Sequence, residues 1–350
     1  MIVYGRIGAH PMGRILLTGG AGFIGSHTAV ALAEAGYSVT VLDDLSNGHR
    51  LALARAQDIC SGDIRLVVGD VRDYNTVRTI FEGDHFASVI HLAGLKSISD
   101  SVDRPLAYFD SNIAGSIALC RAMSDSGIFR LIFSSSATVY GRPRSTPIAE
   151  SHPVGDATNP YGHSKAIVEK LLGDVSRCDP RWSIGILRYF NPIGAHPSGK
   201  IGEQPRGEAA NLLPVICDVL NGKRPYLHIL GDQFPTGDGT GVRDYIHVCD
   251  LAFGHVAALS WTLSNQGLGI WNLGTGRGHS VLEIVSRFEK IAARTIPYRI
   301  GPPREGDVAE CVADPSKAAM ELNWRAVRTM DDMLSDLWAW QLRNPNGYNT

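Results

Sequence analysis

The chain has 350 residues, of which 44% are hydrophobic and 19% are charged, so it can bury a sizeable core and suits one large domain with a smaller appendage. Its formal net charge of −2 provides no overall attraction to nucleic acid or to an acidic membrane, and we expect neither as a partner. The six cysteines include no CxxC pair and the twelve histidines no HExxH motif, which predicts reduced thiols in a cytoplasmic protein and no metal site.

The elements expected in the first half alternate between strands and helices. Residues 1–13 lack the apolar segment of a secretory signal and are expected to be an N-terminal extension. Arg14–Thr18 is predicted as a strand and Phe23–Ala35 as a helix that Gly36 ends. Further strands are predicted at residues 39–42, 65–68, 88–91, 131–134 and 184–188. Helical patterns such as Leu106–Ser124 lie between these runs, which predicts a parallel sheet covered by helices on both faces.

The pattern changes after about residue 190, where segments rich in glycine and proline appear. We therefore predict a first domain over residues 14–190 and a smaller, mixed α/β domain over residues 191–350. Val242–Val248 has the pattern of a strand and is expected to return to the first sheet, so that residues near 242–260 interleave the two domains. No run of about 18 apolar residues occurs, and no membrane span is expected.

A glycine turn follows the first predicted strand. In ILLTGGAGFIGS, Gly19, Gly22 and Gly25 stand at GxxGxxG spacing just before a helix. Glycines there allow a tight turn and let backbone N–H groups and the helix N-terminus approach a pyrophosphate. An ordinary turn also needs glycine, so the spacing alone leaves that alternative open.

Acidic residues end the next two predicted strands. Asp43 lies 18 residues after Gly25, where a carboxylate can accept hydrogen bonds from ribose hydroxyls. Together with Asp44 it would repel a 2′-phosphate, which favours NAD over NADP. Asp70 repeats the pattern after the third strand, at the sheet edge where ligands bind. The run from Asp43 to Gly48 also has the composition of a plain turn.

A serine strand and a tyrosine–lysine helix complete a recognisable set. Tyr161 and Lys165 are four residues apart on a predicted helix and share a face. A nearby ammonium favours phenolate and is expected to lower the pKa of Tyr161, so that it could take a proton from a sugar or alcohol hydroxyl. Ser136 ends LIFSSS, from which its hydroxyl could reach the same oxygen. A surface pair and a strand-end cap are the plainer interpretations of these residues.

These motifs resemble the extended short-chain dehydrogenase/reductases and, within them, the UDP-glucose 4-epimerase family. The resemblance runs from about Arg14 to Tyr348. The stretches that carry it are TGGAGFIGSH, HLAGLKS, IFSSSATVYG, PYGHSK, LRYFNPIGAHPSG, DGTGVRDYIHV and REGD. It implies a Rossmann-type doubly wound parallel sheet that binds NAD over residues 14–190, and a UDP-sugar-binding domain over residues 191–350.

The resemblance also implies an activity. It is the reversible C4 epimerisation of UDP-glucose and UDP-galactose through a transient 4-keto sugar and enzyme-bound NADH. Tyr161 would remove the proton from the hexose 4-hydroxyl with help from Ser136, and Lys165 would lower the tyrosine pKa and contact the nicotinamide ribose. A homodimer is implied, with helices near Leu106–Ser124 and Tyr161–Val175 as the candidate interface.

Binding roles are carried over from the family residue by residue. The cofactor contacts implied in this way are Gly19, Gly22, Phe23, Ile24, Gly25, Asp43, Asp44, Leu45, Ser46, Asn47, Gly48, Asp70, Val71, Leu92, Ala93, Gly94, Lys96, Ser136, Tyr161, Lys165 and Phe190. The substrate contacts implied are Thr138, Asn191, Asn211, Leu212, His228, Leu230, Arg243, Arg304, Asp307 and Cys311.

Several positions depart from the family pattern or separate related chemistries. Ser111 stands where an asparagine is usual, with Asn112 next to it, and Leu92, His228 and Leu230 also differ from the usual residues. Dehydratases of this fold place an Asp–Glu pair directly after the strand-end residue, whereas this chain has alanine and threonine there. Dehydration is therefore disfavoured.

The nature of the sugar is left more open. A small residue at Cys311 goes with acceptance of N-acetylated sugars in the family, so UDP-GlcNAc and UDP-GalNAc are candidate substrates; a plain buried cysteine is the alternative. The sequence is also compatible with a UDP-glucuronate or strictly N-acetylhexosamine 4-epimerase, and with a non-catalytic NAD-sensing scaffold. The scaffold is disfavoured because Tyr161 and Lys165 are both present.

Overall fold

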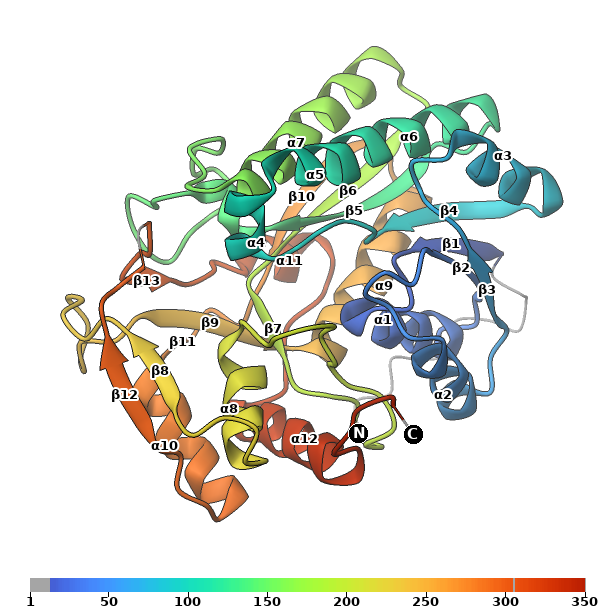
Figure 1. Ribbon diagram of the computed structural model, residues 1–350. Coiled ribbons are helices and arrows are strands. Elements are labelled where there is room, and N and C mark those ends of the chain that lie inside the picture. The colour runs from blue at the N-terminus through green and yellow to red at the C-terminus, as the bar shows by residue number, and fades with distance from the viewer. Residues whose placement is uncertain (1–12, 305, 350) are drawn as a thin grey trace.

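The computed structural model describes residues 13–304 and 306–349 (Figure 1). The predicted N-terminal extension lies outside the described residues except for Gly13. A seven-stranded parallel sheet forms the centre of the molecule, with the strand order β10-β6-β5-β4-β1-β2-β3. Its strands are β1 (Arg14–Thr18), β2 (Ser38–Asp43), β3 (Ile64–Val68), β4 (Phe86–His91), β5 (Arg130–Ser136), β6 (Ser183–Tyr189) and β10 (Gly267–Leu273). This order confirms the predicted doubly wound sheet, because β2 and β3 lie on one side of β1 and the later strands β4, β5, β6 and β10 lie on the other.

Helices cover both faces of this sheet, as its nearly continuous apolar strands require. The helices of this part are α1 (Phe23–Glu34), α2 (Arg50–Cys60), α3 (Tyr74–Gly83), α4 (Ile98–Asp103), α5 (Pro105–Phe109), η1 (Asp110–Ala114), α6 (Gly115–Asp125), η2 (Ala137–Tyr140), α7 (Pro160–Cys178) and α9 (Val248–Ser264). Alternate strand residues divide between two cores: Leu17 packs with α1 and α9, and Leu16 packs with α6 and α7. The single helix predicted over Leu106–Ser124 is continuous but includes η1, a turn of π-helix around Asn112.

The second part of the chain has smaller sheets and its own core. One sheet contains β7 (Asn191–Ile193), β9 (Val242–His247), β11 (Gly278–Ser280) and β13 (Glu310–Cys311), and the other pairs β8 (Leu227–Leu230) with β12 (Tyr298–Gly301). The helices here are α8 (Leu212–Leu220), α10 (Val281–Ala292), α11 (Ser316–Glu321) and α12 (Met330–Arg343). Residues of α8, α10 and α12 share one hydrophobic core, which is separate from the two cores of the large sheet.

The prediction that Val242–Val248 returns to the large sheet is wrong. That segment is β9, which pairs with β7, β11 and β13. The chain returns later, through α9 against α1 and through β10 beside β6. Both β9 and β10 are short strands, of six and seven residues, and their local patterns do not say which sheet each one joins. The strand that pairs with β6 is β10, with the sequence GLGIWNL, in which Trp271 is completely buried.

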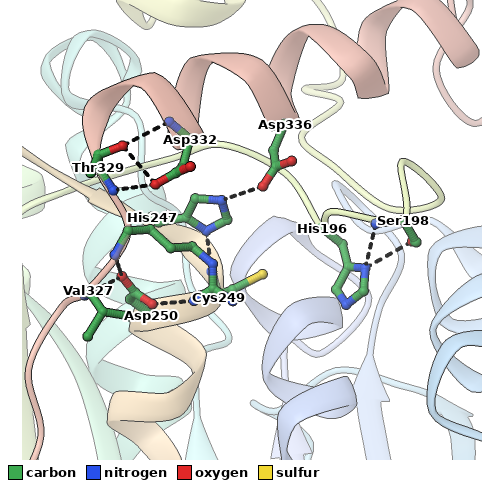
Figure 2. A network of polar contacts seen from close by, with 10 residues as sticks. His196, Ser198, His247, Cys249, Asp250, Val327, Thr329, Asp332 and Asp336 are labelled. Atoms are coloured by element: carbon green, nitrogen blue, oxygen red, sulfur yellow. Dashed lines mark hydrogen bonds and ion pairs between the residues drawn. The ribbon is translucent and has the colours of Figure 1, made fainter. Parts of the chain in front are cut away.

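The end of β9 is also where the C-terminal helix docks (Figure 2). His247 accepts a hydrogen bond from the backbone N–H of Cys249 at 3.0 Å and meets Asp336 of α12 at 3.1 Å. One turn along α9, the Asp250 carboxylate accepts two backbone N–H groups and pairs with the Arg328 guanidinium. This network fixes the start of α9 against α12. Throughout residues 13–304 and 306–349, every helix is too short or too polar to cross a membrane.

Candidate active site

Gly19 and Gly25, in the turn between β1 and α1, have no room for a side chain. Gly19 has φ +70°, and a Cβ there would lie 2.6 Å from the backbone nitrogen of Ala93. A Cβ on Gly25 would lie 2.5 Å from the Cα of Gly20. Gly22 begins α1 without a side-chain cap, so the N–H groups at the start of the helix remain free for an anion. Phe23 and Ile24 form the first turn of that helix.

Asp43 organises the loop after β2 as well as facing the site. Its buried carboxylate accepts hydrogen bonds from the backbone N–H groups of Ala21 at 2.9 Å and Leu45 at 2.8 Å. Burial raises the pKa of this carboxyl, against the effect of the two N–H groups. A Cβ on Gly48 would lie 2.8 Å from the Oδ1 atom of Asp43. Each oxygen keeps a further lone pair, so a ribose hydroxyl can still bind here.

The residues that follow Asp43 are more exposed to solvent than Asp43 itself. Asp44 is exposed and accepts hydrogen bonds from the N–H and hydroxyl of Ser46, beside the exposed Asn47. Asp70 is held by the Arg72 guanidinium, whose hydrogen bonds lower the pKa of the carboxyl. Val71, the residue after Asp70, is buried.

The loop after β4 connects the glycine turn to the serine strand. Leu92 and Ala93 hydrogen-bond to Thr18 at the end of β1. Asn112 fixes the following turn, since its side chain accepts the Leu95 N–H at 2.8 Å and donates to the Leu95 carbonyl at 3.1 Å. A Cβ on Gly94 would lie 2.7 Å from the Asn112 side-chain oxygen. Asn112 therefore shapes this loop from a buried position, whereas its neighbour Ser111 is only half-buried.

Lys96 reveals a contact that the sequence did not predict. Its ammonium pairs with Glu203 at 3.1 Å, and the same segment reaches the loop after β2 through Arg206, which hydrogen-bonds to Asn47 and Gly48. Residues 203–206 thus lie across both loops of the predicted cofactor site. Glu203 is 107 residues from Lys96 in the chain and Arg206 is 159 residues from Asn47, and no local pattern marks them.

Tyr161, Lys165 and Ser136 come together where β5 meets α7. The Asn159 side chain caps the helix by accepting the Gly162 N–H. The Lys165 ammonium is buried, donates to the Ser134 carbonyl at 2.8 Å, and lies 6.0 Å from the ring centroid of Tyr161. Burial lowers the pKa of Lys165 to about 8.

The electrostatics of Tyr161 differ from the expectation. Burial raises the pKa of its hydroxyl, and a hydrogen bond with Ser136 opposes that rise. Lys165 does not lower this pKa here, because its ammonium is directed at the Ser134 carbonyl. Removing a proton from Tyr161 therefore requires additional positive charge nearby.

The substrate-side residues group around β9. Cys311 pairs with Arg243 across β13 and β9, and, like Ala137, it packs against a hydrophobic cluster that includes Phe190. Burial raises the pKa of the Cys311 thiol to about 11. The Arg243 guanidinium donates to two backbone carbonyls and lies 3.8 Å from the Asp307 carboxylate. Thr138, next to Ala137, has a buried hydroxyl without a partner among the described residues.

The remaining predicted substrate contacts lie further along the second part. Asn191 is exposed on β7, beside the strand that carries Arg243. Asn211 precedes α8, where Leu212 begins, and its exposed side chain makes no capping bond. The outermost of these residues are the exposed His228 and half-buried Leu230 on β8, and the exposed Arg304 in the loop after β12. No hydrogen bond or ion pair among the described residues joins this outer group to Tyr161.

These contacts form one line across the carboxyl edge of the sheet. Gly19 abuts Ala93, Gly94 lies against Lys165, Ser136 reaches Tyr161, and the cluster beside Ser136 reaches Cys311 and Arg243. The glycine cradle, the free helix N-terminus and the buried Asp43 fit a dinucleotide such as NAD. Within the part of the chain that the structure describes, no group of three His, Cys, Asp or Glu side chains is placed to hold a metal ion.

Comparison with known proteins agrees with this geometry. Residues 15–274 match the family model described as the NAD dependent epimerase/dehydratase family. UDP-glucose 4-epimerase from Bacillus subtilis is 50% identical over 336 residues, which cover 96% of this chain and 99% of the relative. A crystal structure of UDP-glucose 4-epimerase from Bifidobacterium longum in complex with NAD+ and UDP has a TM-score of 0.93 at 47% identity, over 96% of this chain and 100% of that one.

A solved structure with lower sequence identity also matches this chain. The UDP-Glc/GlcNAc 4-epimerase from Campylobacter jejuni has a TM-score of 0.82 at 31% identity and covers 95% of this chain and 99% of that one. The similarity to these proteins spans nearly the whole chain and confirms the resemblance to the UDP-glucose 4-epimerases. The chain therefore belongs to the NAD-dependent epimerase/dehydratase family.

Proposed function

We propose that this protein is an NAD-dependent 4-epimerase that interconverts UDP-glucose and UDP-galactose. The observation that carries the proposal is the continuous line from the glycine cradle through Lys165 and Tyr161 to Arg243. Such a line suits a dinucleotide at one end and a sugar diphosphate at the other. Relatives named UDP-glucose 4-epimerase at 50% identity support the reaction.

Tyr161 is the group that removes a proton from the hexose 4-hydroxyl in this proposal. NAD, when bound in the glycine cradle, would supply the hydride acceptor for the hexose C4. Ser136 donates or accepts a hydrogen bond at the same oxygen, because it already interacts with the tyrosine hydroxyl. Lys165 contributes positive charge on the same helix face, which favours the phenolate once the ammonium is released from its carbonyl partner.

The diphosphate is held by residues of the second part. Arg243 and Arg304 supply guanidinium groups of the kind that bind phosphate oxygens bidentately. Asn211 lies at the N-terminus of α8, and its side chain makes no capping hydrogen bond, so it can bind the substrate. Asp307 can accept hydrogen bonds from the uridine ribose hydroxyls. His228 and Leu230 lie beside the uracil. We assign residues 14–190 to NAD and residues 191–350 to the UDP-sugar, with α9 and β10 returning to the first domain.

Cys311 sets the range of hexoses. It is paired with Arg243 on the neighbouring strand and packs against the cluster that contains Phe190. It therefore lies between the proposed NAD-binding and UDP-binding regions. Its small side chain leaves space for an N-acetyl group, and we include UDP-GlcNAc and UDP-GalNAc among the substrates. Cys311→Tyr should suppress turnover of the acetylated pair while sparing the plain hexoses. Equal loss on both pairs would contradict this role.

A homodimer is part of the proposal. Helices α4 to α7 leave large apolar side chains exposed on adjacent surfaces, with Leu106 81% exposed. The others of this group are Val102, Ile117 and Ile167. Apolar surface of this extent on neighbouring helices is typical of a subunit interface. We propose that the protein works in the cytoplasm, in keeping with its six free cysteines.

The decisive experiment uses purified protein without added NAD. It is incubated separately with UDP-glucose, UDP-galactose, UDP-GlcNAc and UDP-GalNAc, and each mixture is assayed for the C4 epimer. Conversion of the plain hexoses is expected, because the cradle around Gly19 retains the cofactor. Tyr161→Phe serves as the control that should keep NAD and lose turnover. Absence of any epimer from the parent protein supplied with NAD would refute the proposal.

A further inference from the structure

Helix α7 aligns three chemically active side chains on its inner face. Tyr161, Lys165 and Glu169 are spaced four residues apart, so they follow one another along the same side of the helix. Lys165 and Glu169 are both buried. The Lys165 ammonium lies 4.9 Å from the ring centroid of Phe133 and forms no ion pair with any described carboxylate. It is therefore a buried cation whose direct partners are a carbonyl and the rings of Phe133 and Tyr161.

Glu169 has a different set of partners from those of the lysine. Arg188 of β6 binds it in a bidentate arrangement, with Nε to Oε1 at 3.0 Å and Nη2 to Oε2 at 2.7 Å. The two side chains are 3% and 5% exposed. The Ser135 hydroxyl also donates to Glu169. Ser135 lies between Ser134, whose carbonyl holds Lys165, and Ser136 of the proposed reaction centre.

The pair is anchored further inside the molecule. The second Nη of Arg188 donates to the Tyr140 hydroxyl at 2.9 Å, and that hydroxyl donates to Asn272 of β10 at 2.6 Å. The network therefore joins α7 to β5, β6, β10 and η2. A buried ion pair costs much of its attraction in desolvation, so its presence adds little to stability compared with an apolar pair of similar volume. Glu169 lies one helical turn after Lys165, which indicates that the ion pair acts on the lysine rather than on stability.

We propose that the Glu169–Arg188 pair is a positioning device for Lys165. Through Ser135 it fixes the end of β5 along α7, and through the Glu169 carboxylate it supplies the negative charge that keeps the buried ammonium protonated. Glu169 touches neither the expected substrate nor the expected cofactor in this arrangement and acts only through Lys165. The inference rests on the proposed function, since it concerns the lysine beside the proposed base.

The charges around Lys165 support this role. Titratable groups on the elements packed about it include Tyr161, Glu169, His91, Arg188, Tyr189, Tyr108, Tyr140 and Asp100. Burial lowers the pKa of His91 to about 3 and raises the pKa of each of these tyrosines, so all of them are uncharged between pH 6 and 8. Burial likewise lowers the pKa of Lys165, and Glu169 is the group that opposes it.

The test is the pH dependence of turnover of UDP-galactose. Glu169→Gln removes the negative charge and leaves Arg188 in place, so the pKa of Lys165 should fall by about one unit or more. The alkaline limb of kcat should move to lower pH by the same amount. Activity relative to the parent should then fall about fivefold between pH 6 and pH 8, because fewer molecules keep the lysine charged. KM should change little.

Two further variants separate positioning from folding. Tyr140→Phe removes a hydroxyl from the same network without changing a charge, and it should lower Tm while leaving the alkaline limb in place. Glu169→Gln combined with Arg188→Met removes both buried charges, so it should fold even if the single variant does not. Its alkaline limb should still move to lower pH.

The outcomes are distinguishable from those of the proposed function. A parent protein without epimerase activity refutes the function itself. An active parent, together with a Glu169→Gln variant whose loss is equal at pH 6 and pH 8, overturns the positioning role. If only the double variant can be purified, an unshifted limb in that variant overturns it too.

Discussion

Mild acid should destabilise this protein through three histidines buried in its large domain. Burial lowers the pKa of His27 and His91 to about 3 and that of His255 to about 4, from an ordinary value of 6.5. The folded state thus binds fewer protons than the unfolded state below pH 6.5. The stability linked to these groups is fully present above pH 6.5 and is lost as the pH falls towards 4. Each histidine removes about 1.4 kcal/mol per pH unit over that range.

The three groups together predict a steep dependence. From pH 6.5 to pH 5 they should lower the free energy of unfolding by roughly 5 kcal/mol, which is a large part of a typical domain's stability. Urea denaturation at half-unit steps between pH 5 and pH 7.5 measures the slope. His27→Leu removes one titrating group, whose Nε2 has no partner among the described residues, and should remove about a third of the slope that these three histidines supply. An unfolding free energy that stays constant from pH 7 to pH 5 would refute the reasoning.

Three more changes probe the cofactor site. Gly25→Ser should abolish retention of NAD, measured as bound cofactor after gel filtration, because its Cβ would lie 2.5 Å from Gly20; retained cofactor would show that the turn can shift. Asn112→Leu should cost about 2–4 kcal/mol in urea denaturation, since Leu95 and Ser164 lose buried hydrogen bonds; an unchanged midpoint would contradict its structural role. Glu203→Gln should increase the rate of NAD loss several-fold by releasing Lys96, with a surface Glu82→Gln variant as a control that leaves the rate unchanged.

Much of the large domain could be predicted because its elements carry local signals. Asn159 and Pro160 mark the start of α7, and the structure shows the Asn159 side chain capping it. Gly36 has φ +94° just after α1, as expected of a residue that ends a helix. The assignment of β9 failed for the opposite reason. Which sheet a strand joins depends on partners far away in the chain, and the short sequences of β9 and β10 do not specify those partners.

The residues of the candidate site also fall into those that the sequence could place and those that it could not. Residues at strand ends could be placed because a parallel sheet brings all its carboxyl ends to one edge. Glu203, Arg206 and Asn112 could not be placed from pattern, since their partners lie 17 to 159 residues away. They hold backbone groups or a loop lysine, and such contacts leave no periodic trace in a sequence.

The pKa of Tyr161 shows most clearly what spacing can and cannot determine. An i, i+4 pair fixes a shared helix face, but it leaves the direction of a long lysine side chain undetermined. Here the Ser134 carbonyl takes the ammonium at 2.8 Å, and the tyrosine is left with a raised pKa. A tyrosine in that state is a poor base until positive charge is brought to it. The protein thus keeps its proposed base protonated in this arrangement, and the Lys165 charge that could release the proton depends on a carboxylate one turn further along the same helix.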